Sequence, residues 1–446
     1  MRLHMHNYHA ANIDGIIDGA ILMHREMTQR LLEQVEILWH NIYQGESCLE
    51  GIQEGDIVYS GIGPYAYLYH YWRERIGVDF RIIREVHTTF WSGYWTQEEV
   101  CQPLIRPGDY ALFPTEYTRQ VYMQYFDSIM VDNSATLYPI LDRFPRKAPR
   151  KIQLGYLRIG YLGALSLAKN FDQVLNIFVG CYHKSKAKVS LTIAGKSNHH
   201  QWSQVEVRKR LESKGVASQH IRMLEVITPQ ELDSFFSKID VLLFPSTASR
   251  ESLGRVVLEA LAHGVPVIAA DVGPTVELLP LANKLQTDLR TDQTFSMDKI
   301  VALGQVDEQS TIEKLLSRAY EESSILNEIS YTTKQFWQML NEPRYQPPKI
   351  SGWDRKILDS LIVEKRNLKC DETLIKEAEA LFFNYFQGNN DWLIKLIKER
   401  ISPNEESYFK LLEIVENQER NLADYRAYPR LVDALLLPPL SFSLHS

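Results

Sequence analysis

Short apolar segments alternate with longer segments of helical periodicity along residues 1–340 of the chain. Alternation of this kind is typical of parallel sheets that carry helices on both faces. We therefore expect two doubly wound, Rossmann-like α/β domains. The pattern predicts a helix at 20–39 and strands at residues 2–6, 56–61, 80–86, 110–114, 128–131, 157–163, 190–195, 221–224, 241–245 and 265–270.

Breaks in this pattern predict the domain boundaries. Basic residues around Pro145 and Pro149 mark a linker at about residues 141–153, which places one domain at 1–145 and the next at 151–342. Two α/β halves joined by one linker are expected to face each other across a cleft, where small-molecule sites tend to form.

Residues 346–446 follow a different pattern after a Pro- and Gly-containing hinge at 345–353. The periodicity predicts a helical extension, with helices at 354–367, 371–386 and 391–401. This region holds no catalytic motif, so a lid, a packing brace and an oligomer contact all stay open as its role.

Composition and charge narrow the class of protein. The 446 residues are 45% hydrophobic and 24% charged, which is ordinary for a globular protein, and a net charge of -7 argues against a nucleic-acid partner. The cysteines are scattered without a CxxC pair, which favours a reducing, cytoplasmic location. The N-terminus lacks an apolar signal core and no run of about 18 apolar residues occurs, so no transmembrane segment is expected, while peripheral membrane contact stays open.

The segment from Pro245 to Glu277 carries the most chemistry. It places Glu251 and Glu259 eight positions apart around Gly254. The preceding strand ends at Pro245, so the loop lies at the carboxyl edge of a parallel sheet, where ligands bind in such folds. The pattern therefore predicts a ligand site in this loop.

A phosphate-bearing ligand suits the helix that should follow this loop. Ser252 is expected to cap a helix that begins at Leu253, so that free backbone N–H groups point into the cleft. Gly254 lets a phosphate approach closely, the helix dipole adds positive potential, and Arg250 and Arg255 can add formal charge.

Glu259 is expected to hold a ribose. A carboxylate can accept two hydroxyl hydrogen bonds, which suits a vicinal diol. The alternative is a solvated helix residue, but the neighbours Leu258, Ala260 and Leu261 are apolar.

The string ESLGRVVLEALAHGVPVIAADVG resembles the glutamate-x7-glutamate signature of the retaining GT-B glycosyltransferases of family four. The resemblance implies a hexosyltransferase that moves a sugar from a nucleotide diphosphate sugar, UDP- or GDP-linked, to an unidentified acceptor. It also implies a front-face, metal-independent mechanism with no cofactor, in which the departing phosphate takes the acceptor proton. In this family pattern Glu251 lies by the donor sugar and Glu259 holds the ribose, while the backbone holds the diphosphate at Leu253 and Gly254 and the base at Val226 and Ile227.

The family usually places an arginine and a lysine after the first strand of the second domain. Here Lys169 matches the lysine, while Ala164 stands where the arginine would be. A leaving diphosphate needs fixed positive partners. Three alternatives stay open: Lys169 with a helix terminus suffices, Arg250 or Arg255 substitutes, or activity is low or absent. The alternative for Lys169 is an exposed surface lysine.

In the first domain, His87 ends a predicted strand and by resemblance lies near the donor sugar, where it can bind a hydroxyl. The aromatic residues Trp91, Tyr94 and Trp95 follow and offer an acceptor surface. The alternatives are a structural histidine and hydrophobic packing of the rings.

Other residues match the family less closely. Gly15 and Gly19 fall where the family has a glycine-rich turn that faces the phosphates. Arg119 can face the cleft or the surface, and Glu277 is expected to cap or pack. His199 and His200 lie in a polar segment, and no histidine or aspartate pattern predicts a metal site.

Two alternatives to the glycosyltransferase stay open. A sugar phosphorylase or nucleotide-sugar epimerase uses the same two domains with a different substrate. A non-catalytic partner protein with this fold would be consistent with Ala164.

Overall fold

The computed structural model describes residues 2–6, 19–130, 132–138, 145, 147–151, 155–197, 199–290, 294–295, 297, 299–329, 333–342, 361–363, 366, 371–416, 427–438, 440 and 442–444. Within these ranges, no helix has both the length and the apolar character needed to span a membrane. The predicted linker at 141–153 falls largely outside them, so the domain boundaries stay predictions.

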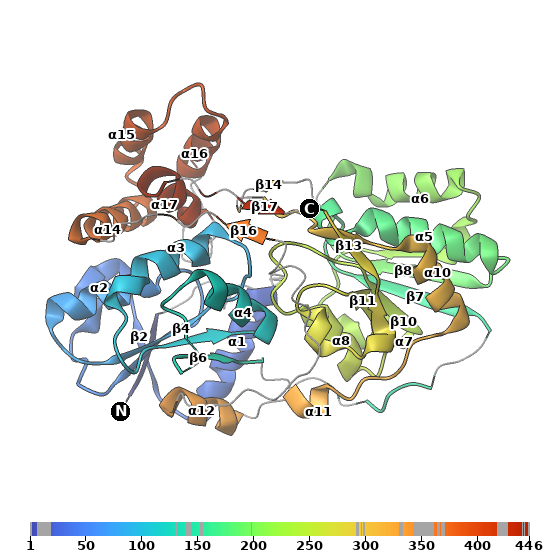
Figure 1. Ribbon diagram of the computed structural model, residues 1–446, viewed down its shortest axis with the longest axis horizontal. Coiled ribbons are helices and arrows are strands. Elements are labelled where there is room, and N and C mark those ends of the chain that lie inside the picture. The colour runs from blue at the N-terminus through green and yellow to red at the C-terminus, as the bar shows by residue number, and fades with distance from the viewer. Residues whose placement is uncertain are drawn as a thin grey trace.

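The first half of the chain forms a six-stranded parallel sheet in the order β2-β1-β3-β4-β5-β6. Helices flank this sheet and bury its apolar faces (Figure 1). The strands are β1 (Leu3–His6), β2 (Ile37–His40), β3 (Ile57–Ser60), β4 (Arg81–Glu85), β5 (Tyr110–Phe113) and β6 (Ser134–Thr136). The helices are α1 (Gly19–Leu31), α2 (Ala66–Ile76), α3 (Ser92–Cys101) and α4 (Glu116–Tyr125).

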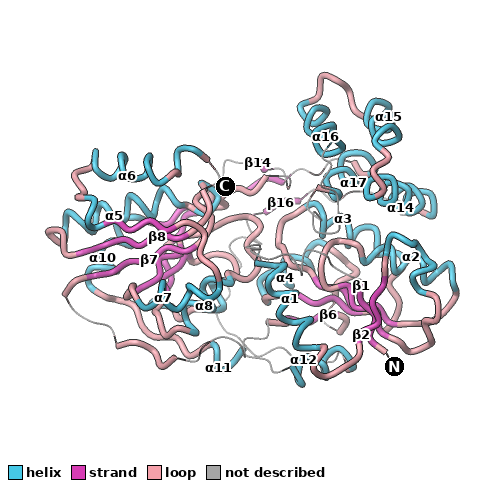
Figure 2. The backbone as a smooth tube through the Cα atoms, turned by 180° about the vertical axis from the view of Figure 1, so that it is seen from behind, coloured by secondary structure: helices cyan, strands magenta, loops and turns pink. Residues whose placement is uncertain are grey.

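The second half repeats the plan with the order β12-β11-β10-β7-β8-β9. Viewed from behind, the two sheets are separate and lie next to each other (Figure 2). The strands are β7 (Leu157–Leu162), β8 (Val189–Ala194), β9 (Ile221–Leu224), β10 (Val241–Phe244), β11 (Val267–Ala270) and β12 (Lys284–Leu285). The helices are α5 (Phe171–Lys184), α6 (Gln204–Ser213), α7 (Leu232–Ser237), α8 (Arg255–Ala262), α9 (Thr275–Leu278), α10 (Glu308–Ser317) and α11 (Leu326–Ile329). Helix α12 (Thr333–Asn341) returns to the first half and packs beside α1 (Figure 1), where the Asn341 carbonyl accepts from Arg81 of β4 at 3.0 Å.

The strand order has a switch point in each sheet. In the second sheet, β7 pairs with both β10 and β8. The strands β8 and β9 are added on one side of β7, and β10, β11 and β12 are added on the other side. Ligands bind in open α/β sheets at the carboxyl ends of the strands near such a point. The loops that follow β7 and β10, which hold Lys169 and Glu251, lie at this place.

Two expectations for the first sheet were wrong. The predicted helix at 20–39 ends at Leu31, and the residues that follow a turn form the edge strand β2. The predicted strand at 128–131 is not a strand in its described part, because the Asn133 side chain accepts from the Met130 N–H at 2.8 Å and donates to the Ser128 carbonyl at 3.0 Å. This side-chain bonding closes a local turn, so β6 starts only at Ser134.

The C-terminal extension packs on the first half of the chain. Its helices α14 (Glu372–Phe386) and α17 (Tyr428–Leu436) place Phe382 and Tyr428 against Tyr65, while α15 (Asn390–Arg400) and α16 (Glu406–Glu416) lie further out (Figure 1). Aromatic packing of this kind anchors a helix through a large buried area.

The helix predicted at 354–367 is wrong in its described part. Residues 361–363 form the strand β16 (Leu361–Val363), which pairs with β17 (Phe442–Leu444). The same β17 pairs on its other edge with β14 (Thr294–Phe295) from the second half. The remaining strands, β13 (Thr287–Leu289) and β15 (Gly304–Val306), form a separate antiparallel pair.

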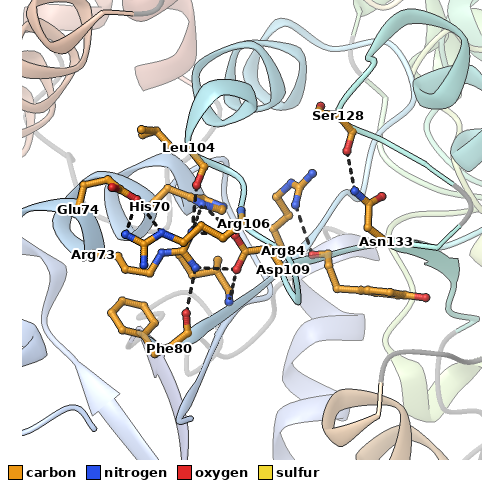
Figure 3. A network of polar contacts seen from close by, with 12 residues as sticks. His70, Arg73, Glu74, Phe80, Arg84, Leu104, Arg106, Asp109, Ser128 and Asn133 are labelled. Carbon is orange, nitrogen blue, oxygen red and sulfur yellow. Dashed lines mark hydrogen bonds and ion pairs between the residues drawn. The ribbon is translucent and has the colours of Figure 1, made fainter. Parts of the chain in front are cut away.

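A buried ion pair closes the amino edge of the first sheet (Figure 3). The Asp109 carboxylate accepts two hydrogen bonds of 2.7 Å from Arg73 on α2, and backbone N–H groups of Ile82 and Arg106 donate to it at 2.9 and 2.8 Å. The Arg73 guanidinium also donates to the backbone carbonyls of Phe80 and Leu104. This network lies at the edge opposite to the ligand loops, so we assign it a structural role.

Candidate functional site

The loop after β10 carries Glu251 and leads into the helix that carries Glu259. Helix α8 begins at Arg255, with Gly254 as its N-terminal cap residue at φ 71°. The expectation that Ser252 caps a helix from Leu253 is therefore wrong. Gly254 is required here because its backbone lies in the left-handed region, which other residues adopt at a cost.

Glu251 and Lys169 form an ion pair across two loops of the second half. Lys169 comes from the short 3-10 turn Leu167–Lys169 after β7, and its side chain is 26% exposed. The other Glu251 carboxylate oxygen accepts from the Gly254 N–H at 3.2 Å. Lys169 is therefore engaged in the site rather than lying free on the surface, and Glu251 occupies the N–H group predicted to bind a phosphate.

Glu259 is buried, so the alternative of a solvated helix residue is wrong. Arg255 donates from Nε to Glu259 at 2.8 Å and from Nη2 to Glu26 of α1 at 2.9 Å. Burial raises the pKa of the Glu259 carboxyl, and the nearby Arg255 opposes this effect. One guanidinium thus lies between two carboxylates, one from each half of the chain.

His87 lies at the junction of the two halves. Its ring Nε2 contacts the Gly61 carbonyl oxygen and lies 3.5 Å from a Glu85 carboxylate oxygen. Its backbone carbonyl accepts from the Ser252 hydroxyl, and the Thr89 hydroxyl donates to the Glu251 carbonyl at 2.9 Å. The structure therefore brings the histidine segment of the first half against the glutamate loop of the second.

The aromatic residues after His87 are buried. Trp91, Tyr94 and Trp95 are 2%, 0% and 2% exposed, and Trp95 packs on Phe126 with ring centroids 5.0 Å apart. The packing alternative therefore accounts for these rings, and their role in acceptor binding stays an untested prediction. Arg250 lies over the Trp91 ring at 5.8 Å and donates to the Met297 carbonyl at 2.7 Å.

The other predicted positions are spread over the two halves. Val226 and Ile227 follow the carboxyl end of β9, with Val226 40% exposed. Gly15 lies outside the described residues. Gly19 begins α1 and faces the Arg255 side chain, since a Cβ built on it would lie 3.8 Å from Arg255 Cδ. Ala164 offers its backbone carbonyl to the Tyr161 hydroxyl.

Several side chains outside the glutamate motif belong to this junction. Glu277 accepts from the Glu116 backbone N–H with both carboxylate oxygens, at 3.0 and 3.1 Å, and so caps helix α4 of the other half. Burial, with the neighbouring Glu116 charge, raises the pKa of Glu277 well above its usual value. Arg119 pairs with Glu116 at 3.2 Å within α4. Capping is one of the two roles that the sequence predicts for Glu277, whereas no sequence pattern indicates Glu26 or Glu85.

In the described part of the chain, no group of three or more histidine, cysteine, aspartate or glutamate side chains is arranged to hold a metal ion. His199 and His200 are exposed. Metal independence stays a prediction, because it depends on the bound substrate as well as on the protein.

Comparison with known proteins supports the coarser part of the resemblance, a glycosyltransferase domain of group 1, while the retaining family four and its glutamate signature stay predictions. Residues 142–285 match the family model described as Glycosyl transferases group 1. An "Uncharacterized 41.2 kDa protein in cps region" of Klebsiella pneumoniae is 27% identical over 139 residues, which are 31% of this chain and 34% of that protein. The chain therefore matches about a third of the length of this curated relative.

Solved structures share the two-domain arrangement. Anabaena Alr3699/HepE in complex with UDP superimposes with a TM-score of 0.51 at 14% identity, covering 78% of this chain and 96% of that chain. The same protein in complex with UDP and glucose gives 0.50 at 15% identity and the same coverage. The chain thus has the predicted GT-B fold, and the match of residues 142–285 to the glycosyl transferases group 1 model supports the prediction of a glycosyltransferase.

Proposed function

We propose that the protein is a retaining glycosyltransferase that moves a hexose from a nucleotide diphosphate sugar to an acceptor hydroxyl. The observation that carries the proposal is the charge arrangement that follows the carboxyl ends of β7 and β10, where Lys169 pairs with Glu251 and Arg255 pairs with Glu259. These four side chains lie within the segment that matches the family model. UDP in the Anabaena complexes supports a uridine nucleotide as the first donor to test.

The diphosphate would bind Lys169 and Arg255 in place of the carboxylates of Glu251 and Glu259, which these side chains now contact. Lys169 lies beside the N-terminus of α8, where the helix dipole and the Gly254 N–H favour an anion. Arg255 occupies the first turn of the same helix. It can supply the second positive charge, which the arginine of the family pattern would provide and Ala164 does not. Positive groups fixed where negative charge develops lower the barrier to departure of the diphosphate.

The two glutamates would then bind hydroxyl groups. Glu251, released from Lys169, can accept from the transferred sugar, and Glu259 can accept from the ribose diol. The departing phosphate takes the acceptor proton on the same face, so this mechanism needs no protein base and no metal ion. Contact of the two halves around His87 and Ser252 would exclude water and limit donor hydrolysis.

Thermal-shift measurements with UDP, GDP, ADP and their sugar conjugates test donor binding, because a ligand that binds only the folded state raises the melting temperature. Glu259→Ala should weaken nucleotide binding by about tenfold, since a hydrogen bond to a charged group is lost. Lys169→Ala should lower turnover by about 10²–10³-fold, as for loss of a group that stabilises the leaving charge.

Lys209→Ala is the matched control, because Lys209 is exposed and pairs only locally with Glu206. Donor binding and turnover that stay unchanged in both site variants would contradict the assignment. Donor binding without transfer or hydrolysis, over a broad range of acceptors, would instead favour a non-catalytic partner protein.

A further inference from the structure

A buried polar cluster lies behind His87 in the first half of the chain. Glu85, the last residue of β4, is 2% exposed, and Tyr59 of the adjacent strand β3 is 1% exposed. The Tyr59 hydroxyl donates to the Glu85 carboxylate oxygen that faces His87. Burial raises the pKa of Glu85, while His87 and Tyr59 oppose this effect. A buried carboxyl that shares its partners in this way is costly to fold, and such groups gather at functional sites.

The contacts of the His87 ring fix its tautomer. Nε2 faces the Gly61 carbonyl oxygen, which can only accept, and also lies 3.5 Å from Glu85. Nε2 therefore carries the ring proton, and in the neutral imidazole Nδ1 keeps its lone pair. Within the described residues, no hydrogen bond to Nδ1 is present.

The Gly61 carbonyl that His87 contacts lies in closely packed surroundings. A Cβ built on Gly61 would lie 2.8 Å from the Tyr59 ring and 2.9 Å from the His24 ring, so these side chains close tightly around the carbonyl that His87 contacts. On its other side the His87 ring lies 6.3 Å from the Tyr94 ring. The cluster thus holds the imidazole at the junction with the glutamate loop.

We propose that Glu85 and Tyr59 are positioning residues that keep His87 as the Nε2–H tautomer, with Nδ1 as the acceptor for a hydroxyl of the sugar substrate. Glu85 adds a second acceptor on the side of Nε2, and Tyr59 fixes the rotamer of the Glu85 carboxylate. The inference rests on the proposed function for the identity of the hydroxyl, but not for the tautomer. It assigns a role to two buried residues at positions that the glutamate motif does not include.

The tautomer is measured directly by ¹⁵N NMR of protein labelled at its 13 histidines, with the His87 signal assigned by its loss in His87→Gln. We expect protonated Nε2 and unprotonated Nδ1 in the wild-type protein. Glu85→Gln, which replaces an acceptor by an amide that can donate to Nε2, should raise the fraction of the Nδ1–H form severalfold. Tyr59→Phe should do the same to a smaller extent.

Turnover provides the second measurement. Glu85→Gln should lower kcat by about tenfold, the size typical of losing a group that orients a site side chain, and leave KM for the nucleotide sugar within about twofold. Tyr110→Phe is the matched control, because it also removes a buried hydroxyl that donates to one partner, the Ser134 carbonyl at 3.2 Å, on a strand of the same sheet. It should leave both the tautomer and kcat unchanged.

A wild-type His87 protonated at Nδ1 would overturn the proposal. So would folded Glu85→Gln and Tyr59→Phe variants, with wild-type melting temperatures, that keep the wild-type tautomer and kcat. If the tautomer shifts as expected in a protein that transfers no sugar, the positioning role stands and the proposed function fails.

Discussion

Two buried charge clusters, at opposite edges of the sheets, differ in how they are balanced. At the amino edge, Asp109 has one arginine of its own and four hydrogen bonds. At the junction of the two halves, Arg255 is shared between Glu26 and Glu259. The amino-edge pair is neutral, whereas the junction triad carries a net negative charge.

The direction of the pKa shifts reflects this difference. Burial alone would raise the pKa of Asp109, but the hydrogen bonds and charge of Arg73 lower it overall. Burial raises the pKa of Glu259 and Arg255 does not cancel the effect. A carboxylate whose partners offset its burial serves the fold, whereas one whose pKa stays raised is a candidate for ligand binding.

The largest expected loss of stability comes from a substitution that breaks the ion pair of Asp109 and Arg73 at the amino edge. Asp109→Asn leaves Arg73 buried without a counter-charge, which should lower the free energy of unfolding by about 3–5 kcal/mol. Glu259→Gln, a substitution of the same kind at the junction, should change it by less than about 1 kcal/mol because Arg255 keeps Glu26. Chemical denaturation measures both, and equal losses would remove the distinction between the two clusters.

A third cluster tests whether shared arginines behave alike. Arg366 lies between Glu99 of α3, at 2.9 Å, and Asp433 of α17. Burial raises the pKa of Glu99 from 4.5 to about 7, against the effect of Arg366 and with that of Asp433. The folded state therefore holds this proton more tightly than the unfolded state does.

The pH dependence of stability follows from that shift. The contribution is fully present below about pH 4.5 and is lost as the pH rises through about 7, amounting to about 3 kcal/mol. In Glu99→Gln this loss should vanish, so that the variant gains stability over the wild-type protein between about pH 5 and pH 8. Chemical denaturation of both proteins at about pH 5 and pH 8 measures this difference. If the free energy of unfolding changes equally in the variant and the wild-type protein, the pKa of Glu99 is not raised.

The smallest expected effect concerns Glu26. Glu26→Gln removes a negative charge beside Arg255, so a nucleotide diphosphate should bind about threefold to tenfold more tightly. Glu33→Gln is the control, since Glu33 is exposed and pairs with Arg30 close in sequence. Titration calorimetry with UDP measures the difference, and an equal affinity in both variants would show that Glu26 does not oppose the ligand.

Much of the fold could be predicted from the sequence because apolar runs that turn residues bound on both sides have few alternatives. Segments such as 157–163 and 241–245 match β7 and β10 closely. The edge strand β2 was missed because its four residues, Ile37–His40, continue the apolar spacing of the preceding helix. A short run of this kind cannot be told from a helix by periodicity alone.

The site was predictable where the chemistry is local. Spacing along one loop and one helix singled out Glu251, Gly254 and Glu259 as a candidate site, and the helix start was misplaced by two residues. Partners from the other half could not be predicted, because nothing in the local pattern around Glu26 or Glu85 shows which surface it will meet. Burial of Trp91 and its neighbours likewise depends on elements distant in the sequence.

The capping of α4 by Glu277 means that one half completes a helix of the other. If the halves move apart, the Glu116 N–H in the first turn of α4 loses its acceptor, while the buried Glu277 carboxyl regains water. Local order at Glu116 is therefore coupled thermodynamically to the separation of the halves. The rate of hydrogen exchange at the Glu116 amide would therefore report the fraction of molecules in which the two halves are in contact.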